Sequence, residues 1–506
     1  MFINEKMFMQ IMNIRLGGNH TISKNFLLST VVTLIIGIVN MLYPIVVGLF
    51  NDVEIMGDFT ILIFWSVILS IPIQNGLSPA LSRFIAASDI DDEQPLKSLS
   101  LKISAIYLLI IFMSFPFLGY FLFIIDLLEV FVIIALFSVS IFHYLFRNML
   151  LGQEKLKQLF LIEIVSFVIF LIFAVFFGIL PGILNWAHLE KDYYFCIPII
   201  AYHFTFNALF LLFIYRKFTF KKFFKFPSIT KNILKYSFLI GFGSILGLGI
   251  NKLQIIISEK YISSFEVGVL SFWNYAIAPL LLLSIALGAI LLPRVSNLHR
   301  YKHDLINPFI NKTNWAVSLF ITPLIGSILL IIAIFPNLLA FSALSKYQSN
   351  NYWPIIILLG LQATTSLLST PTMAYFSSSE KKVMFNLLIS LIYTISIIIS
   401  WVLLVPNYGI FGFAIGIAVG GLTSSISTQI IALIVTKGKI GLHILFEIPI
   451  YCFFGLNIYL IKYWLYLPII LWFVFSVPFF IIGIRLFKSI LTKKDYSIRY
   501  NNLEVQ

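Results

Sequence analysis

One basic side chain, Lys252, stands within a long apolar run. It belongs to the short polar cluster Asn251-Lys252-Leu253-Gln254, about six residues from the end of that run. A charge inside the hydrocarbon layer of a membrane costs roughly 2.5–3.5 kcal/mol on insertion scales, so such residues are functional candidates. A lysine that faces a central cavity could hold a phosphate or an acidic sugar by charge-assisted hydrogen bonds. The alternative is a lysine that snorkels to the lipid headgroups.

Uncharged amides form the rest of the predicted binding set. Asn251 and Gln254 share a helix face, whereas Lys252 is turned roughly 100° from Asn251. Amides pair with sugar hydroxyls, and the aromatic face of a residue such as Trp273 can stack on a pyranose ring. The alternative role is hydrogen bonding between helices, worth roughly 0.6–2 kcal/mol each. The amides in other apolar runs are Asn40, Gln74, Asn75 and Asn274.

Two arginines, Arg83 and Arg294, end apolar runs on the same side of the membrane. They could receive a pyrophosphate at the cytoplasmic mouth of a cavity, or they could be ordinary anchors under the positive-inside rule. Arg147 is a weaker candidate for the same role. The predicted substrate-binding residues are Lys252, Arg83, Arg294, Asn251, Asn274, Asn40, Gln74 and Asn75.

Other titratable groups are assigned structural roles. His143 and His203 are expected to be packing residues, and Glu163 and Glu447 are expected at water-exposed positions near helix ends. Cys196 and Cys452 lie within or at the edge of apolar runs and are expected to be buried, inert thiols, with no disulfide framework and no metal site.

Sequence motifs for enzymes are absent. No Gly-x-x-x-x-Gly-Lys-Ser/Thr loop and no His-Glu-x-x-His motif occurs, so we expect no catalytic residue, cofactor or metal. Asp52, Glu54 and Asp58 crowd one short outer loop and could coordinate a metal in a membrane glycosyltransferase. That loop has only about eight residues, and no large outer domain exists to hold an acceptor. A transporter is therefore favoured over an enzyme.

The elements that carry these residues are long apolar segments. The chain has 506 residues, of which 60% are hydrophobic and 11% are charged. A helix needs ~20 apolar residues to cross a membrane, and continuous apolar runs indicate helices rather than barrel strands. The sequence predicts fourteen spans at about 26–50, 59–80, 103–125, 130–150, 159–183, 195–215, 236–258, 268–292, 314–337, 353–376, 384–405, 409–436, 445–463 and 466–486.

The basic residues are sorted between alternate connections. If the N-terminus is inside, 29 of the 34 Lys and Arg residues lie on inner segments, and Lys252 lies within a helix. By the positive-inside rule, both termini are cytoplasmic. The net charge of +13 thus reflects topology, and the expected partner is the anionic membrane surface rather than nucleic acid. The outer loops hold Lys191, Lys260, Lys346 and Lys462.

An internal repeat divides the chain into two lobes. Arg83 follows Gly57 by 26 residues, and Arg294 follows Gly268 by the same number. Each glycine lies near the start of the second span of its six. Parallel repeats with a site between them are typical of two-lobed transporters. The predicted units are an N-lobe at 1–215, a basic cytoplasmic loop at 216–235, a C-lobe at 236–436, and helices thirteen and fourteen with a tail at 437–506.

Glycines suggest close helix packing. Gly412, Gly416 and Gly420 have the spacing that lets two helices approach closely. A second group crowds the seventh span, where either tight packing or a hinge would explain it. The second group is Gly241, Gly243, Gly247 and Gly249.

Three stretches resemble the polysaccharide flippases of the multidrug/oligosaccharidyl-lipid/polysaccharide (MOP) exporter superfamily. The strongest match runs from Glu266-Val-Gly268 through Ser271-Phe-Trp-Asn-Tyr275 to Ala286-Leu-Gly-Ala-Ile-Leu-Leu-Pro293 and looks like the family's eighth helix. Tyr408-Gly-Ile-Phe-Gly412 is similar to the start of the family's twelfth helix, and the stretch from Gly57 to Arg83 also fits. The resemblance covers essentially the whole chain in helix number and order.

This resemblance implies both a fold and a cargo. The fold is an all-α, MATE-like integral membrane protein, with two pseudo-symmetric six-helix lobes and two C-terminal helices around a cavity that opens alternately to each side. The cargo is an undecaprenyl-pyrophosphate-linked oligosaccharide of O-antigen or capsule type, moved to the outer leaflet of the cell membrane. Basic cavity residues in the family would match Lys252, Arg83 and Arg294. Polysaccharide polymerase or chain-length machinery is a further expected partner.

Departures from related branches leave alternatives open. The lipid II flippase branch typically carries arginines within its cavity helices, including helix eight, but the eighth span here has no charge between Glu266 and Arg294. The drug-exporting branch usually places acidic residues inside its lobes, but the first span here has none. An O-antigen or capsule flippase is favoured, with a cation-coupled MATE-type drug exporter as the runner-up. A lipid II flippase and a membrane glycosyltransferase are less favoured.

Overall fold

The structure is a computed structural model of the 506-residue chain. The predicted thirteenth span, most of the basic loop, Glu447 and Cys452 lie outside the residues that it describes. The described residues are 28, 31–32, 34–87, 90–122, 126–153, 155–184, 192–213, 230–301, 303–334, 345–348, 353–379, 382–441, 443 and 467–492.

Every regular element in these ranges is helical. The first half of the chain contains η1 (Ile38–Leu42), α3 (Tyr43–Phe50), α4 (Val53–Ile71), η2 (Pro72–Leu77), α5 (Ser78–Ala87), α6 (Ile90–Leu122), α7 (Leu127–Gly152), α8 (Leu156–Ala174), η3 (Val175–Ile179), α9 (Leu180–Leu184), η5 (Asp192–Cys196) and α10 (Ile197–Phe213).

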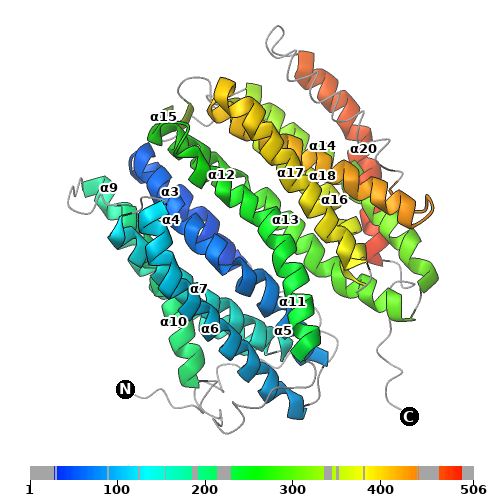
Figure 1. Ribbon diagram of the computed structural model, residues 1–506. Coiled ribbons are helices and arrows are strands. Elements are labelled where there is room, and N and C mark those ends of the chain that lie inside the picture. Colours follow the sequence, from blue (N-terminus) through cyan, green and yellow to red (C-terminus); the bar gives the residue numbers. More distant parts are fainter. Residues whose placement is uncertain are drawn as a thin grey trace.

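The second half contains α11 (Thr230–Ser244), η8 (Ile245–Gly249), α12 (Ile250–Ser258), α13 (Ser264–Tyr301), η9 (His303–Leu305), α14 (Ile306–Ile334), α15 (Ser345–Gln348), α16 (Trp353–Ser377), α17 (Val383–Tyr408) and α18 (Ile410–Val435). Helix α20 (Leu467–Thr492) follows these elements. In Figure 1 the first-half helices lie together on one side and α14, α16, α17 and α18 lie on the other, with α12 and α13 between them.

The helices coincide with the predicted spans. Nine helices in the described part of the chain are long and apolar enough to cross a membrane, and they match the predicted second to seventh and tenth to twelfth spans. Helices α13 and α14 match the eighth and ninth spans, and two shorter apolar helices, Leu34–Phe50 and Ile470–Leu486, match the first and fourteenth. The all-helical membrane fold is thus confirmed, whereas the number fourteen stays a prediction.

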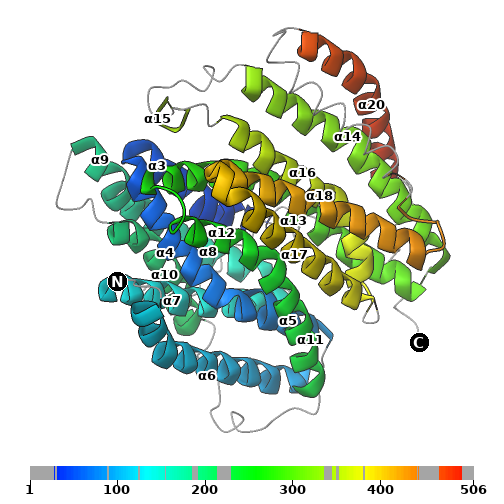
Figure 2. The same cartoon turned by 45° about the horizontal axis from the view of Figure 1, so that its top comes forward.

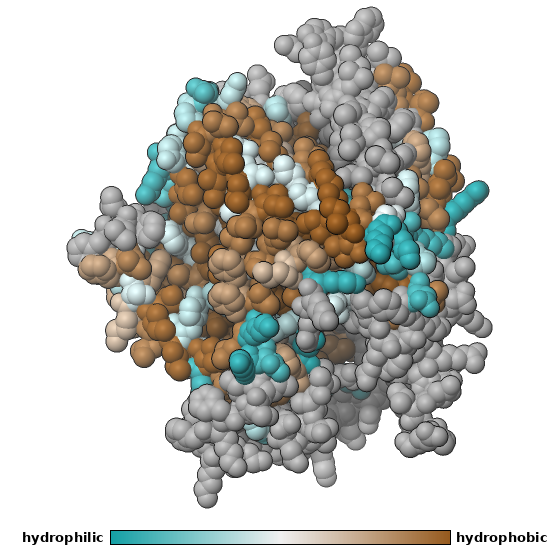
Figure 3. Space-filling model, turned by 45° about the vertical axis from the view of Figure 1, so that its right-hand side comes forward, coloured by the Kyte–Doolittle hydropathy of each residue, from teal (hydrophilic) through white to brown (hydrophobic). Residues whose placement is uncertain are grey.

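Apolar side chains cover much of the described surface. Helix α6 is the clearest case, because Met113 is 71% exposed and Phe117 is 63% exposed. Figure 2 shows α6 along one outer edge of the molecule, and Figure 3 shows a broad apolar surface on the face that it draws. Exposed apolar patches of this extent are incompatible with a water-facing surface, so these helices face lipid. The chain is a multi-pass membrane protein.

The predicted close packing of the twelfth span is confirmed. A Cβ built on Gly416 would lie 2.4 Å from the ring of Trp401, and one built on Gly420 would lie 2.3 Å from Ile397. Both neighbours belong to α17, so the glycine stripe of α18 is the surface on which α17 packs. Substituents larger than hydrogen at these positions would push the two helices apart.

The C-terminal helix α20 packs on α14 through a tryptophan. Trp472 is 1% exposed, its ring faces Gly326, and its indole N–H donates to Ser327 Oγ at 2.9 Å. Where α20 passes α14 again, a Cβ on Gly483 would lie 2.6 Å from the backbone nitrogen of Phe320. Figure 2 shows the two helices side by side.

We expect Trp472→Ala to loosen this contact. Removal of a fully buried tryptophan leaves a cavity beside Gly326 and removes one hydrogen bond to the Ser327 hydroxyl, which still donates to the carbonyl oxygen of Pro323. Such changes cost on the order of 3 kcal/mol. Thermal unfolding of the purified protein in detergent measures the loss. Val474→Ala is the matched control, because Val474 lies on the same helix and is 71% exposed. Equal melting temperatures for the two variants would contradict the expected role of Trp472.

The two halves touch at glycines. A Cβ built on Gly268 of α13 would lie 1.9 Å from the carbonyl oxygen of Val53, and one on Gly57 of α4 would lie 3.1 Å from the backbone nitrogen of Gly268. Toward the other end of the interface, a Cβ on Gly76 would lie 3.1 Å from Gly241 Cα. Helix backbones can approach this closely only without side chains.

Three of the helices at this interface contain a π-helical turn: η1, η2 and η8. Such turns are rare and occur frequently at functional sites. Among the glycines of the predicted seventh span, Gly241 makes the tight contact, whereas Gly247 and Gly249 lie in η8. A Cβ on Gly243 or Gly247 would meet only ordinary contacts, at 3.9 and 3.7 Å. Tight packing therefore explains Gly241 but not Gly243 or Gly247.

Helix α15 bridges the halves at a third place. Tyr347 is buried, stacks on Phe272 with ring centroids 3.9 Å apart, and donates to the carbonyl oxygen of Gly48 at 2.6 Å. The Lys346 ammonium donates to the carbonyl oxygen of Asn51. Desolvation lowers the pKa of Lys346 from its ordinary value, and Asp52 partly opposes this effect. Helix α15 thereby fastens the second half to the end of α3.

Candidate functional site

Lys252 points across the interface between the two halves. Its ammonium lies 3.9 Å from the ring centroid of Phe64 on α4 and 6.0 Å from that of Tyr275 on α13. The two rings are 5.7 Å apart and tilted by 52°. A lysine that snorkelled would lie along its own helix toward the headgroups, whereas this one is directed at aromatic faces that attract cations.

The charge of Lys252 is available for an anion. In the part of the chain that the structure describes, its ammonium contacts these two rings and forms no ion pair. A cation–π contact leaves the three ammonium N–H groups able to donate to another partner. A phosphate or a carboxylate that reached this place would meet a lysine held in position by rings from both halves.

The amides predicted to help Lys252 are turned elsewhere. Asn251 accepts a hydrogen bond from the Tyr393 hydroxyl at 2.5 Å, inside the second half. Asn274, beside Tyr275 on α13, is half-buried and donates to Leu270 O of its own helix at 2.9 Å. Trp273 is 3% exposed, so its faces are covered by protein. The aromatic rings beside the Lys252 ammonium are therefore Phe64 and Tyr275, neither of which is among the predicted site residues.

Asn40 and Gln74 lie together inside the first half. Both line a small cavity of about 30 Å³. Ser70 donates to Gln74 at 3.1 Å, and Asn40 hydrogen-bonds to Tyr144. Asn75, the next residue, is half-buried. This space, the Asn40 cavity, is lined by Asn40, Ile63, Ser66, Val67, Ser70, Gln74, Leu136, Ser140, Tyr144, Ile199 and His203.

The structure describes the side chain of only one of the two repeat arginines, Arg83. Arg83 on α5 is exposed, and its guanidinium carbon lies 4.5 Å from the ring centroid of Tyr236 on α11. It therefore spans the interface at the end opposite to Gly57. Arg294 belongs to α13, but its side chain lies outside the described residues. Their predicted equivalence stays a prediction.

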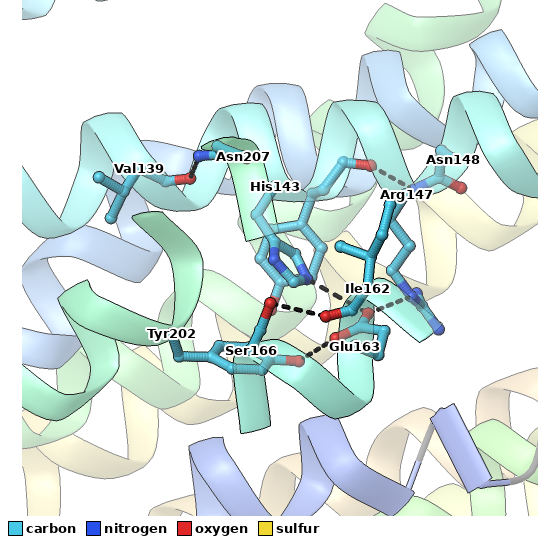
Figure 4. A network of polar contacts seen from close by, with 10 residues as sticks. Val139, His143, Arg147, Asn148, Ile162, Glu163, Ser166, Tyr202 and Asn207 are labelled. Carbon is cyan, nitrogen blue, oxygen red and sulfur yellow. Dashed lines mark hydrogen bonds and ion pairs between the residues drawn. The ribbon is translucent and has the colours of Figure 1, made fainter. Parts of the chain in front are cut away.

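A buried charged network lies deeper in the first half (Figure 4). Glu163 on α8 is fully buried, accepts a hydrogen bond from the Tyr202 hydroxyl, and has its other oxygen 3.7 Å from His143 Nε2 and 3.9 Å from Arg147 Nε. The ring of His143 lies 4.6 Å from that of His203. We call Glu163, His143, Arg147, Tyr202 and His203 the Glu163 cluster.

This cluster corrects two expectations. Glu163 was expected at a water-exposed position, but it is 0% exposed because α7 and α10 close around it. His143 and His203 are buried as expected, yet they are not simple packing residues, because His143 faces a carboxylate. A signal was present in the sequence: Arg147 and Glu163 lie at similar depths on consecutive antiparallel spans joined by a short loop.

The acidic residues of the predicted first outer loop belong to no metal-holding group in the part of the chain that the structure describes. Asp52, Glu54 and Asp58 are all exposed. Among the described residues, no three His, Cys, Asp or Glu side chains are close enough together to hold a metal ion. Cys196 is buried as a free thiol.

Comparison with known proteins defines the class of fold. No protein-family model and no curated protein matches the sequence. The lipid II flippase MurJ, in an inward closed conformation, matches the structure with a TM-score of 0.61 at 13% identity, over 92% of this chain and 99% of that chain. An inward-facing multidrug resistance MATE family transporter of the MOP superfamily matches with a TM-score of 0.55 at 16% identity, over 79% and 96%.

A third match is a MOP superfamily transporter from Pyrococcus furiosus Vc1, with a TM-score of 0.50 at 17% identity, over 80% of this chain and 94% of that chain. The chain therefore has the fold of MOP-superfamily transporters. More particularly, it resembles both the flippase and the multidrug members of that superfamily.

Proposed function

We propose that the protein is a flippase for an undecaprenyl-pyrophosphate-linked oligosaccharide repeat unit of O-antigen or capsule type. It acts by alternating access, as a transporter and not as an enzyme, and moves its cargo from the cytoplasmic to the outer leaflet of the cell membrane. The observation that carries the proposal is Lys252, whose ammonium lies between the two halves with its charge available. A pyrophosphate is the part of such a cargo that a fixed cation recognises.

The extent of the fold supports a lipid-linked cargo. The lipid II flippase structure corresponds to 92% of this chain, whereas the MATE structure corresponds to 79%. At 13% identity this likeness says nothing about which lipid-linked molecule is carried. The lack of charge in α13 between Glu266 and Arg294 argues against lipid II, and we therefore favour a polysaccharide repeat unit. We place both termini in the cytoplasm and expect polysaccharide polymerase or chain-length machinery as partners.

One observation favours the second candidate, a cation-coupled drug exporter. Drug exporters of this superfamily usually carry acidic residues inside their lobes, and Glu163 is a carboxylate buried inside the first half. Its neighbour Arg147 offsets the negative charge, so the site differs from a lone carboxylate that would attract a cationic drug. The flippase remains the first proposal.

Deletion of the gene tests the two candidates against each other. For a flippase we expect loss of surface polysaccharide, and lipid-linked repeat units should remain on the cytoplasmic face, where a membrane-impermeant oxidant cannot reach their sugars in intact cells. Sensitivity to cationic drugs should not change. A plasmid-borne copy of the gene is the control and should restore display. Normal surface polysaccharide in the deletion strain contradicts the flippase, and a gain in drug sensitivity supports the exporter.

A further inference from the structure

The contact between Lys252 and Phe64 joins the two halves through one side chain from each. Lys252 belongs to α12 of the second half, and Phe64 belongs to α4 of the first half. The ammonium lies 3.9 Å from the centroid of the Phe64 ring, well within the roughly 6 Å over which an aromatic face attracts a cation. Besides placing a charge at the interface, Lys252 therefore holds the halves together at this point.

The surroundings of the contact favour a strong attraction. Phe64 is 2% exposed, and Tyr275, whose ring is the second neighbour of the ammonium, is 4% exposed. Water screens a cation–π attraction least where the rings are buried in this way. Such attractions correspond to a factor of about 2 to 30 in an equilibrium constant, and desolvated contacts lie at the upper end.

An anion that pairs with Lys252 weakens this attraction. The face of an aromatic ring carries negative potential, so it attracts a cation and repels an anion. A diphosphate that accepts hydrogen bonds from the ammonium cancels the charge that Phe64 attracts. It also brings further negative charge toward the same ring. Binding of the anion and contact between the halves at Phe64 therefore oppose each other.

The opposition acts in both directions. Two linked equilibria change each other by the same factor, so a contact that the anion weakens must in turn weaken the binding of the anion. While the site is empty, the attraction of Lys252 to Phe64 favours the arrangement of the halves in this structure. When an anion occupies the site, that preference is reduced and the halves are freer to move.

We propose that Lys252 and Phe64 form a latch between the halves that a diphosphate releases. Phe64 is a positioning residue, which acts on the cargo only through Lys252. The proposal rests on the proposed function, because the releasing anion is the diphosphate of the lipid-linked cargo. It gives Phe64 an effect that a simple wall of a binding site would not have: the ring lowers the affinity for the cargo and thereby couples occupancy to motion.

Titration calorimetry with inorganic pyrophosphate tests the latch, with the full-length protein in phosphatidylcholine nanodiscs. Replacement of Phe64 by mono-, di- and trifluorinated phenylalanine removes negative potential from the ring stepwise while nearly preserving its shape. The affinity for pyrophosphate should rise with each fluorine, by about 2- to 30-fold in total, and Phe64→Leu should act in the same direction. An affinity that falls or stays constant along the series overturns the latch.

Phe59→Leu is the matched control for this series. Phe59 is also on α4 and is 0% exposed, but its ring contacts Tyr43 and Phe195, which both belong to the first half. The substitution disturbs the core of the same helix without touching the latch, so the affinity for pyrophosphate should stay at the wild-type value. A rise equal to that of Phe64→Leu would assign the effect to loosened packing and overturn the latch.

A distance measurement tests the release of the halves. Spin labels at Ile183 of α9 and Tyr408 of α17, both more than half exposed and in different halves, report the separation of their ends in a background with Cys196→Ser and Cys452→Ser. Pyrophosphate should shift the distance distribution of the wild type. The empty protein with trifluorinated Phe64 should show the same shift without pyrophosphate. Identical distributions for the two empty proteins overturn the latch.

The two measurements separate failure of the latch from failure of the flippase site. Pyrophosphate binding that depends on Lys252 but not on the fluorination of Phe64 contradicts the latch alone, and the anion site remains. Wild-type protein that binds no pyrophosphate contradicts both the anion site and its release of the halves. Binding that persists unchanged in Lys252→Met places the anion elsewhere and overturns both as well.

Discussion

Lys252→Met should reduce transport of the lipid-linked oligosaccharide by about 10- to 150-fold. A hydrogen bond to a charged group is worth about 1.5–3 kcal/mol, and each 1.4 kcal/mol is a tenfold change. Methionine preserves the length and apolar stem of the side chain, so its packing between Phe64 and Tyr275 should persist. The measurement is flipping of the purified pyrophosphate-linked oligosaccharide in proteoliposomes, together with surface display in the complemented deletion strain.

Two further variants separate charge from structure. Lys252→Arg keeps the cation and its attraction to aromatic faces, so it should retain a substantial part of the activity. Lys260→Met removes a lysine from the loop between α12 and α13 and should transport normally, at equal protein abundance. Wild-type transport by Lys252→Met would show that this lysine binds no cargo.

Gly268→Ala should force the halves apart where α4 meets α13. The added Cβ would lie 1.9 Å from the carbonyl oxygen of Val53, and because that neighbour is backbone, the helices themselves must move. Overpacking of this kind costs typically about 1–3 kcal/mol, which is enough to shift a transporter strongly toward a form open at this end. A cysteine at Ser271, which is 0% exposed in the wild type, should become accessible to a membrane-impermeant thiol reagent.

Gly288→Ala provides the matched control on the same helix. Its Cβ would lie 3.6 Å from Thr370 Cγ2, an ordinary contact, so neither labelling nor transport should change. Gly268→Ala should also lose most of its transport activity, because alternating access requires that each end can close. Unchanged labelling of the Ser271 cysteine would mean that the contact yields without opening the interface.

Hydropathy predicted the helices well because a helix that crosses the membrane must be long enough and apolar enough to span the hydrocarbon layer. It underestimated helix α13, which continues to Tyr301 although the predicted span ends near 292, and α6, which begins at Ile90 rather than near 103. Both extensions carry polar residues, since a helix can project beyond the hydrocarbon layer without apolar side chains. The chain sequence alone therefore locates the hydrocarbon part of a helix better than its ends.

The candidate site was predicted only in part. The sequence indicates how deep a residue lies in the membrane, but it indicates much less well which neighbouring helix the side chain faces. The roughly 100° between neighbouring helix positions predicts that Asn251 and Lys252 face different ways. Asn251 does face Tyr393 inside the second half, and Lys252 faces Phe64 across the interface. For Glu163 the sequence signal is limited to its depth, which matches that of Arg147 on the preceding span, and its chain neighbours Ile162 and Ile164 are apolar. Its partners come from α7 and α10, and only tertiary packing brings them together.

The contact between Gly57 and Gly268 joins two positions that the predicted internal repeat would make equivalent. A residue can meet its own counterpart only close to a twofold axis, as in the interface of a symmetric dimer. A single repeat unit would thus present a self-complementary surface there, and two separate copies could pair through the same glycine.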